Sequence, residues 1–313
     1  MKLLIEVPTW LGDCVMATAS IENIVKYYPD IEITIFGAYV STEIFKKHPN
    51  VKKIIFDKGK TSKLRFLWLY KKARELDTFD IALSFRESFA SKFFIYGLKA
   101  KKRGVYKRDK NIEYHQVERY NDFINHVFGM NNKANYLKIY IDPLQYKKPT
   151  LGINPGASYG SAKRWYPQKF SKVAKALSEK YNIIIFGGPA EVDMAYDIEK
   201  ALKHFGVDNY INIAGKTTIV ELCEKIGGLD LFITGDSGPM HVAAAYKVPT
   251  VAIFGPTKEK ETNQWKNEKS IIVKKEMECA PCMKRVCPLQ HHECMKLIEV
   301  EDVLNAVKKL GLT

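Results

Sequence analysis

The hydrophobic and polar positions in the first half of the chain alternate between two patterns. Short apolar runs, of the kind found in buried parallel strands, lie at residues 2–7, 31–36, 51–56 and 79–85. Between these runs, apolar residues recur at helical spacing at 15–28 and 64–76, and a further helix is predicted at 115–128. Because strands that alternate with helices form parallel sheets, this half is predicted to be a doubly wound α/β domain.

The same alternation starts again after a break. Residues 141–149 are polar and contain proline and lysine, which predicts a linker. Strand-like runs follow at 150–154, 182–187, 210–214, 229–234, 250–254 and 271–273. We therefore expect two doubly wound, Rossmann-like domains, 1–145 and 150–313, that face each other across a cleft and bind ligands at the carboxyl ends of their strands.

The most informative segment is Phe232-Ile-Thr-Gly-Asp-Ser-Gly-Pro-Met-His241. An apolar run ends at the small, polar residues 234–238, and a short apolar helix pattern follows at 240–246. This turn is therefore predicted to join the carboxyl end of a strand to the amino end of a helix, where backbone N–H groups and the helix dipole attract phosphate. Ser237 is positioned to cap the helix or to bond a phosphate oxygen.

Other interpretations of this turn stay open. Gly-Asp-Ser-Gly resembles the nucleophile segment of chymotrypsin-like proteases, but those enzymes are disulfide-bearing β-barrels, whereas this chain alternates strands with helices. A Gly-x-Ser-x-Gly elbow needs glycine at the position that Pro239 occupies. The plainest account is an ordinary strand–helix turn without a ligand.

Three other loops are expected at the same strand ends. Residues 8–13 follow the first strand, residues 152–165 open the second domain, and residues 186–191 follow its next strand. Glycine gives a ligand access to the backbone, Lys163 and Arg164 supply positive charge, and Glu191 can accept hydrogen bonds from ribose hydroxyls. Together these loops fit a nucleoside diphosphate.

The charge balance of the chain is strongly basic. Its 49 lysines and arginines outnumber 35 aspartates and glutamates, for a formal net charge of +14. Such a balance indicates anionic partners: nucleic acid, an anionic membrane face or phosphorylated small molecules. Basic residues are mixed with aromatic ones at 62–74 and 99–110. A lysine-rich solvated surface is the plainer account of part of this charge.

Length and the amino terminus bound the class of protein. The 313 residues suit two domains, and no apolar run approaches the roughly 18 to 20 residues that span a bilayer. The first apolar run carries one basic residue and meets Glu6 and Pro8, so it is predicted to be a strand rather than a signal peptide. We expect a cytoplasmic protein with reduced cysteines.

Six segments carry a family resemblance. They are Trp-Leu-Gly-Asp at 10–13, Asn-Pro-Gly-Ala-Ser at 154–158, Ala-Lys-Arg-Trp at 162–165, Gly-Gly-Pro-Ala-Glu at 187–191, Asp-Ser-Gly-Pro-Met-His at 236–241 and Cys-Pro-Leu-Gln-His-His-Glu-Cys-Met at 287–295. With these segments in this order, the sequence resembles the ADP-heptose:lipopolysaccharide heptosyltransferases, the family 9 glycosyltransferases of the two-domain GT-B fold. The third and sixth segments resemble heptosyltransferase II, which adds the second inner-core heptose, more than heptosyltransferase I.

The resemblance implies an enzyme that inverts the anomeric carbon while it moves a heptose from ADP-heptose to a lipid A–Kdo–heptose core. Asp13 matches the general base, Lys163 the diphosphate-binding lysine, Ser158 a hydroxyl near the phosphates and Glu191 the ribose-binding acid. The loop and helix start that hold the nucleotide sugar are matched by Asp236, Ser237, Gly238 and His241. Heptosyltransferase I, or another sugar transferase of the same fold, is the alternative.

The same resemblance assigns the acceptor to the first domain and the nucleotide sugar to the second. Because such acceptors are anionic and anchored in the cytoplasmic leaflet, we expect the basic first domain to lie at the inner face of the inner membrane. The candidate acceptor-binding cations are Arg65, Arg86, Lys101, Lys102, Arg103 and Arg108.

Each assignment has a plain alternative. Asp13, expected just before a helix, fits an N-cap, and Lys163 fits an ordinary surface lysine. His241 fits a hydrogen-bonded structural histidine as well as a substrate contact. A basic two-domain protein is also compatible with nucleic-acid binding through residues 99–110, although no RNA- or DNA-binding signature accompanies them.

Neither a cofactor nor a metal is expected. No Asp-x-Asp triplet, the motif that holds a divalent ion in transferases of the other major fold, occurs in the chain, so positive side chains must neutralise the diphosphate. One cluster complicates this expectation. Four cysteines beside His291 and His292 suffice for a tetrahedral zinc site, although their spacing is irregular for a zinc ribbon and reduced structural thiols are the plainer account. These cysteines are Cys279, Cys282, Cys287 and Cys294.

Overall fold

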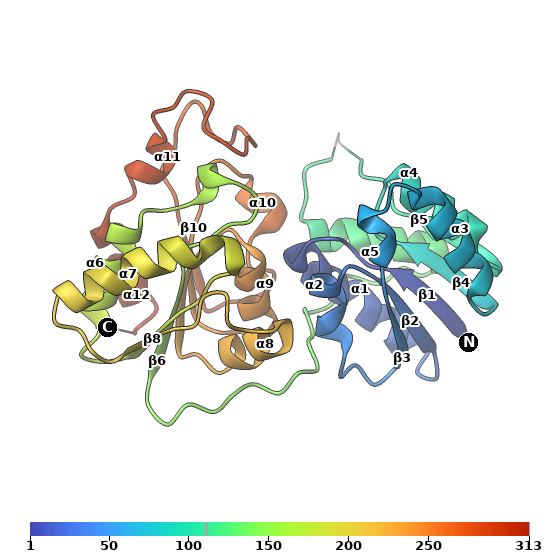
Figure 1. Ribbon diagram of the computed structural model, residues 1–313, viewed down its shortest axis with the longest axis horizontal. Helices are drawn as coiled ribbons and strands as arrows, with labels where there is room; N and C mark the ends of the chain where they lie inside the picture. The colour runs from blue at the N-terminus through green and yellow to red at the C-terminus, as the bar shows by residue number, and fades with distance from the viewer. Residues whose placement is uncertain (110–111, 313) are drawn as a thin grey trace. The chain divides into compact units, whose positions relative to one another are not determined.

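The structure of the protein is a computed structural model that describes residues 1–109 and 112–312 (Figure 1). These residues divide into two compact units, Met1–Ile141 and Asp142–Thr313. The division falls at the start of the polar segment 141–149. Within the described ranges, no helix combines the length and the apolar character that crossing a membrane requires.

The first unit is built on a five-stranded parallel sheet in the order β3-β2-β1-β4-β5. Its strands are β1 (Lys2–Glu6), β2 (Glu32–Gly37), β3 (Val51–Phe56), β4 (Phe79–Ser84) and β5 (Ala100–Val105). The central strand β1 pairs Leu4 with Thr34 on one side and with Ala82 on the other. Because this strand is covered on both faces, its sequence is an unbroken apolar run up to Glu6.

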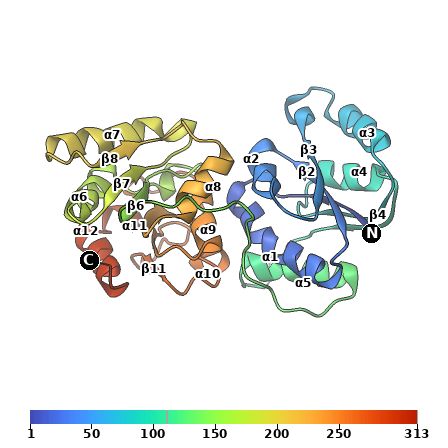
Figure 2. The same ribbon diagram turned by 90° about the horizontal axis from the view of Figure 1, so that it is seen from below.

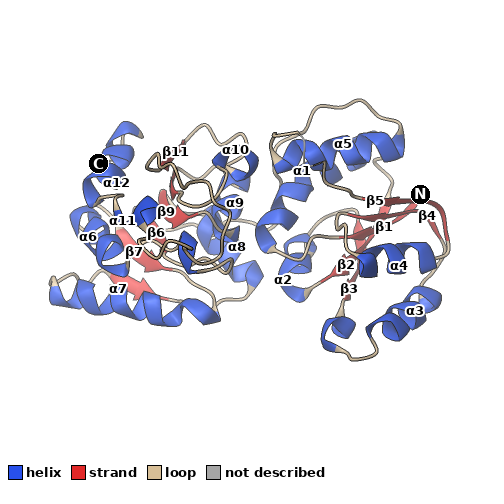
Figure 3. Ribbon diagram, turned by 90° about the horizontal axis from the view of Figure 1, so that it is seen from above, coloured by secondary structure: helices blue, strands red, loops and turns tan. Residues whose placement is uncertain are grey.

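Helices cover both faces of the first sheet. Helix α1 (Leu11–Tyr27) packs with α5 (Gln116–Phe128) on one face, and α3 (Arg65–Glu75) packs with α4 (Phe89–Gly97) on the other (Figure 2, Figure 3). Three shorter helices are α2 (Tyr39–Thr42), η1 (Glu43–Phe45) and η2 (Lys58–Thr61). The core under α3 and α4 joins Leu69 and Phe94 of the helices to Leu4 and Phe36 of the strands.

The second unit contains a six-stranded parallel sheet in the order β11-β10-β9-β6-β7-β8. Its strands are β6 (Thr150–Asn154), β7 (Asn182–Ile185), β8 (Tyr210–Asn212), β9 (Leu231–Gly235), β10 (Thr250–Ile253) and β11 (Ser270–Val273). The strand order reverses between β6 and β9, as it does between β1 and β4 in the first unit. Loops that leave such a pair of strands diverge to opposite faces and open a crevice at the carboxyl edge.

The helices of the second unit also lie on two faces. Helices α6 (Pro167–Leu177), α7 (Val192–His204) and α12 (Val300–Lys309) cover one face, and α8 (Ile219–Gly227) and α9 (Gly238–Ala245) cover the other (Figure 3). Shorter helices are η3 (Ser161–Lys163), η4 (Pro189–Glu191), α10 (Glu259–Thr262) and α11 (Glu293–Lys296). The prediction of two doubly wound, parallel-sheet α/β units is confirmed.

One strand was not predicted, and one helix begins earlier than predicted. The basic cluster at 99–110 contains the edge strand β5, whose Lys102 pairs with Ile81 of β4. Lysine is disfavoured in strands, and this strand has no apolar alternation, so its pattern did not reveal it. Helix α1 begins at Leu11 rather than at residue 15, because the apolar and small residues after Trp10 already continue the helix.

Candidate active site

The loops after β6, β7 and β9 meet at the carboxyl edge of the second sheet. Asn154 is the last residue of β6, and Thr234 is the last residue but one of β9. The two residues are opposite each other in the parallel register. Their side chains meet, since Asn154 Nδ2 lies 3.4 Å from Thr234 Oγ1. The segments 155–166 and 236–238 are therefore brought together at the point where the strand order reverses, where doubly wound sheets bind ligands.

A lysine and an aspartate from these two loops form a buried ion pair. Lys163 Nζ lies 2.5 Å from Asp236 Oδ2, and their side chains are 13% and 5% exposed. Thr257 Oγ1, from the loop after β10, donates to the same carboxylate oxygen at 2.6 Å. Asp236 thus holds the lysine ammonium beside the amino end of α9, so that lysine charge and helix dipole act at one place. The alternative of an ordinary surface lysine is wrong.

An aromatic ring adds a second restraint on this ammonium. Lys163 Nζ lies 4.7 Å from the centroid of the Tyr159 ring, and the Arg285 guanidinium lies 5.5 Å from the same ring. Tyr159 is itself anchored, because its hydroxyl donates to the carbonyl of Met283 at 2.7 Å. The two cations therefore flank one ring and concentrate positive charge on the loop after β6.

Ser237 occupies the N-cap position of α9, as the sequence predicted, but its hydroxyl makes no capping hydrogen bond to the helix. Instead its Oγ lies 3.3 Å from Asn154 Nδ2 and 3.3 Å from Thr234 Oγ1. The amino end of α9 is thus not closed by a side-chain cap, which leaves the Gly238 N–H for an anion, since Pro239 has no N–H and that of Met240 donates to the Ser237 carbonyl. Helix starts of this kind offer backbone N–H groups to an anion.

Glu191 lies at the same edge, in the loop after β7. It is buried, and its Oε2 accepts a hydrogen bond from the backbone N–H of Gly188 at 2.6 Å. A Cβ at position 156 would stand 2.0 Å from the carboxyl carbon of Glu191, so a larger residue there would displace this carboxylate. The glycine-rich loops after β6 and β7 therefore make room for one acid between them.

The remaining predicted residues of this unit lie on the same loops. Ser158 is exposed on the loop after β6, and His241 is buried in the first turn of α9. Asn154 and Thr257 are site residues that sequence reasoning did not single out. Asn154 could have been found, because a polar residue that ends a buried strand was visible in the motif at 154–158.

In the first unit, Asp13 lies in the first turn of α1, two residues inside the helix, and the N-cap is Trp10. The N-cap alternative for Asp13 is therefore wrong. Burial raises the pKa of Tyr120 of α5 well above its ordinary value, and the charge of Asp13 raises it further. The preceding loop leaves β1 at the switch point of the first sheet, so Asp13 is placed at that carboxyl edge.

A polar cluster that the sequence did not indicate lies at the same edge. Glu6 ends β1 and is buried, with one carboxylate oxygen 3.0 Å from Arg86 Nη1 and the other accepting from Ser84 Oγ at 2.6 Å. Burial raises the pKa of Glu6, and the Arg86 charge opposes that rise. A glutamate at the end of an otherwise apolar strand was the available signal. Arg86, one of the candidate acceptor-binding cations, therefore lies at the carboxyl edge of the first sheet, where Asp13 also lies.

The other predicted cations are spread over the first unit. Arg65 pairs with Asp57 at the start of α3, and the backbone N–H of Arg108 donates to Glu87 beyond the end of β5. Lys101 pairs with Asp80 at 2.7 Å, beside Lys2 at the amino end of the sheet. Lys101, Lys102 and Arg103 lie within β5, before its carboxyl edge, and Arg103 donates to the carbonyl of Leu98; their contact with the acceptor stays a prediction.

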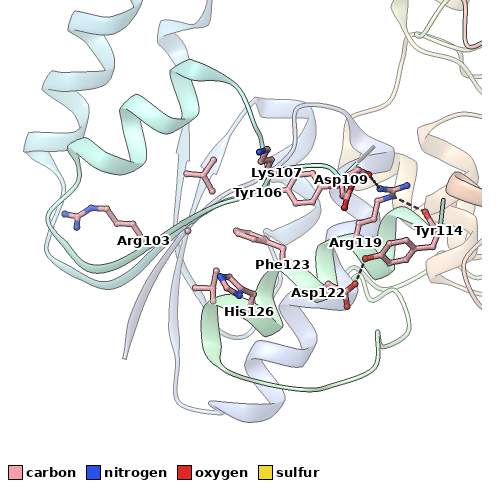
Figure 4. A pocket seen from close by; sticks show the side chains of 12 residues that line it. Arg103, Tyr106, Lys107, Asp109, Tyr114, Arg119, Asp122, Phe123 and His126 are labelled. Carbon is pink, nitrogen blue, oxygen red and sulfur yellow. Dashed lines mark hydrogen bonds between the residues drawn. The ribbon is translucent and has the colours of Figure 1, made fainter. Parts of the chain in front are cut away.

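Figure 4 shows a pocket of about 420 Å³ between the end of β5 and α5. Arg119 crosses it and donates to the carbonyls of Asp109 and Tyr114, and Tyr114 in turn donates to Asp122. Arg103 extends away from these side chains (Figure 4). The guanidinium of Arg119 is thus used to hold the chain around it, which makes this pocket a weaker candidate than the loop clusters.

The four clustered cysteines line one small cavity of about 20 Å³ together with His291 and His292. Burial, followed by the nearby thiols, raises the pKa of Cys294 to about 11. Throughout residues 1–109 and 112–312, no three histidine, cysteine or acidic side chains are arranged to hold a metal ion. The zinc alternative stays a prediction, because these thiols share one cavity but are not arranged around an ion.

Comparison with known proteins identifies the family. A model of glycosyltransferase family 9 (heptosyltransferase) matches residues 69–293. The chain belongs to this family. A Campylobacter jejuni protein named lipooligosaccharide heptosyltransferase 2 is 42% identical to this family 9 chain over 99% of this chain and 98% of its own length. The protein is therefore a glycosyltransferase, and the family assigned from the six segments is confirmed.

Solved structures agree with this assignment at the level of the fold. The Escherichia coli ADP-heptose lipopolysaccharide heptosyltransferase II matches with a TM-score of 0.81 at 23% identity, over 99% of this glycosyltransferase and 98% of that chain. The Escherichia coli heptosyltransferase WaaC, solved with ADP, matches with a TM-score of 0.79 at 14% identity, over 99% and 100%. The protease interpretation and the nucleic-acid-binding alternative are not favoured by any of these matches.

Proposed function

We propose that this glycosyltransferase moves a heptose from ADP-heptose to the heptose-bearing inner core of lipooligosaccharide, as a heptosyltransferase II. The observation that carries the proposal is full-length similarity to a protein named lipooligosaccharide heptosyltransferase 2, at 42% identity. The predicted residues Lys163 and Asp236 support it, because their buried pair lies at a helix start suited to a diphosphate.

The second unit is the proposed site of ADP-heptose. Lys163 Nζ and the Gly238 N–H at the start of α9 bind the diphosphate, with Ser237 and the exposed Ser158 beside it. Asp236 orients the lysine rather than touching phosphate, since a carboxylate next to a phosphate would repel it. His241 contributes from the first turn of α9.

The ribose is assigned to Glu191. Its Oε2 is held by the Gly188 N–H, so the carboxylate is fixed in orientation and can accept hydrogen bonds from ribose hydroxyls. Gly156 and Gly188 let the nucleotide approach the backbone on either side of this acid.

The transfer step requires one base and one stabilised leaving group. An acceptor hydroxyl oxygen attacks the anomeric carbon from the face opposite ADP, its proton passes to the Asp13 carboxylate, and the bond from that carbon to the ADP oxygen breaks. Lys163 and the α9 dipole stabilise the negative charge that develops on ADP. A single displacement of this kind inverts the anomeric carbon. No metal is assigned a role, because the two cations beside Tyr159 supply positive charge.

The first unit is the proposed acceptor site, at the edge where Asp13 and Arg86 lie. Arg86, positioned by Glu6, and Arg108, beyond the end of β5, are the cations best placed for the phosphates and acidic sugars of a lipid A–Kdo–heptose acceptor. Because that acceptor is anchored in lipid, the enzyme is proposed to work in the cytoplasm, attached peripherally to the inner face of the inner membrane.

The proposal is tested by transfer assays with purified protein. ADP-heptose, ADP-glucose and UDP-glucose are offered with core acceptors that end in Kdo or in the first heptose, with and without a chelator. Heptose addition to the heptose-ended acceptor, unaffected by chelation, is expected. Transfer to the Kdo-ended acceptor instead would assign heptosyltransferase I, and transfer from another nucleotide sugar would refute the donor assignment.

A further inference from the structure

Helices α3 and α4 carry apolar side chains on faces that point away from the core. In α4, the buried residues Ser91, Phe94 and Ile95 face the sheet. Phe89, Phe93 and Tyr96 lie on the opposite side of the same helix, because positions spaced by three or four residues share a helix face. The helix is therefore apolar on two faces, although only one of them has a partner within the unit.

Exposed aromatic residues of the two helices meet at the Phe66 ring. The Phe66 ring of α3 contacts two rings of α4, with centroid distances of 5.7 Å to Phe89 and 5.3 Å to Phe93. Phe89 is 72% exposed and Tyr96 is 67% exposed. The whole set consists of Leu64, Phe66, Leu67, Tyr70, Phe89, Phe93 and Tyr96. Single exposed apolar residues are ordinary, whereas a contiguous group of this size marks an interaction site.

Cations outnumber acids on these two helices, which carry five lysines and arginines and one acid, Glu75. The segments 61–74 and 88–99 contain no aspartate or glutamate. Their exposed cations are Lys63, Lys71, Arg74, Lys92 and Lys99. The Arg74 guanidinium lies 5.9 Å from the Tyr70 ring, so charge and aromatic surface are adjacent. Of the nearest acids, Glu75 pairs with Lys72 and Glu87 accepts from a backbone N–H.

This combination selects one kind of partner. Lysine is depleted from protein–protein interfaces, whereas aromatic residues mixed with lysine and arginine are typical of surfaces that insert into the headgroup region of an anionic bilayer. We propose that the exposed faces of α3 and α4, the α3–α4 surface, dock this glycosyltransferase onto an anionic membrane. This inference rests on the proposed function in one respect: the membrane is the one that carries the lipid-anchored acceptor.

The docking is carried by two kinds of contact. Phe89 and Tyr96 insert beside the headgroups, and the long stems of Lys71 and Lys92 let their ammonium groups reach lipid phosphates. Arg65 does not take part, because it pairs with Asp57 and its side chain is only 17% exposed. The basic clusters of the sequence are thus divided: the exposed residues within 62–74 other than Arg65 belong to the docking surface, and residues 100–105 form strand β5.

The experiment measures binding of the full chain to vesicles by co-sedimentation. Vesicles of phosphatidylethanolamine with phosphatidylglycerol are compared with vesicles of phosphatidylcholine alone. The apolar variant is Phe89→Ser with Tyr96→Ser, and the charge variant is Lys71→Gln with Lys92→Gln. Binding to the anionic vesicles is expected to weaken at least tenfold in the first variant. In the second it should weaken about thirtyfold at low salt, at about 1 kcal/mol for each lost charge.

Matched controls remove similar side chains elsewhere. Tyr27→Ser with Tyr196→Ser deletes two aromatic residues that are 58% and 59% exposed, outside the α3–α4 surface. Lys308→Gln with Lys309→Gln deletes two exposed lysines of α12. Both controls should bind vesicles as the wild type does. Equal losses in the controls and the test variants would overturn the proposal, because the effect would then be nonspecific.

Transfer assays separate this inference from the proposed function. The apolar variant should keep wild-type transfer to a water-soluble, deacylated core and lose transfer to the same core embedded in anionic vesicles. If the wild type transfers no heptose to either acceptor, the proposed function fails while the vesicle experiment still decides the docking surface. Wild-type vesicle binding in both test variants would overturn the docking proposal. So would concentration-dependent self-association that the apolar variant abolishes, since it would assign the patch to a second copy of the chain.

Discussion

Replacing Lys163 with methionine should lower the stability of the second unit and weaken ADP binding. The two effects can be measured separately. The change leaves the Asp236 carboxylate, 5% exposed, with the Thr257 hydroxyl but without its charged partner. Breaking a buried pair from one side costs about 3 to 5 kcal/mol, and the partial exposure of the lysine places this pair at about 3 kcal/mol. For a unit of this size, the melting temperature is expected to fall by about 6 to 12 °C.

The same change should weaken ADP binding. A charge-assisted contact with phosphate is worth about 2 kcal/mol, so the dissociation constant should rise about thirtyfold. Scanning calorimetry measures the first effect, and titration calorimetry with ADP, at a temperature where the variant is folded, measures the second.

A second variant separates structure from binding. Adding Asp236→Asn to Lys163→Met removes both charges, and the amide oxygen can still accept from Thr257, so stability should return to within about 1 kcal/mol of the wild type. ADP affinity should stay low. Recovery of both properties would show that the lysine serves only the fold. An unchanged melting temperature in the single variant would refute the buried pair.

Three further changes probe the other elements of the site. Asp13→Ala should lower turnover by about two to four orders of magnitude while ADP affinity is kept, and wild-type turnover would remove this residue from the mechanism. Burial raises the pKa of Glu6 above its ordinary value of 4.5. The stability of the wild type relative to Glu6→Gln should therefore be greatest below pH 4.5 and should fall as pH rises through the folded pKa. Urea unfolding at several pH values measures this stability difference, and a difference that does not change with pH would contradict the prediction. Gly156→Ala puts a methyl 2.0 Å from the carboxyl carbon of Glu191 and should weaken ADP binding about tenfold, whereas Gly97→Ala, with only a 3.5 Å contact, serves as the control that keeps wild-type affinity.

The turn at 234–238 illustrates what local sequence is sufficient to predict. A buried apolar run, a small polar turn and a short apolar helix are each encoded by neighbouring residues, so their order along the chain was readable without a structure. The parallel sheets followed from the same alternation, because only crossover connections join such strands. The segments that hold Asp13 and Lys163 were located in this way, whereas the roles of the two residues came from the family resemblance.

Contacts between distant residues were decided by the tertiary structure alone. Lys163 and Asp236 are separated by 73 positions, and no local pattern states that β6 and β9 are neighbours. The same holds for Glu6 and Arg86, which become partners because β1 and β4 pair. Strand β5 was invisible for the converse reason: its lysines are tolerated only because it lies at an edge of the sheet.

The exposed aromatic residues show the same division. Helical periodicity correctly placed a helix at 64–76, but it could not say which of two apolar faces the core would cover. That choice depends on the sheet beneath, where Leu69 packs against the core while Phe66 is left outside to meet Phe89 and Phe93. The sequence alone therefore determined most of the elements, the family resemblance and the chemistry of individual residues. The three-dimensional packing decided which charges are paired and which apolar residues face the solvent, because both depend on neighbours that the chain order does not specify.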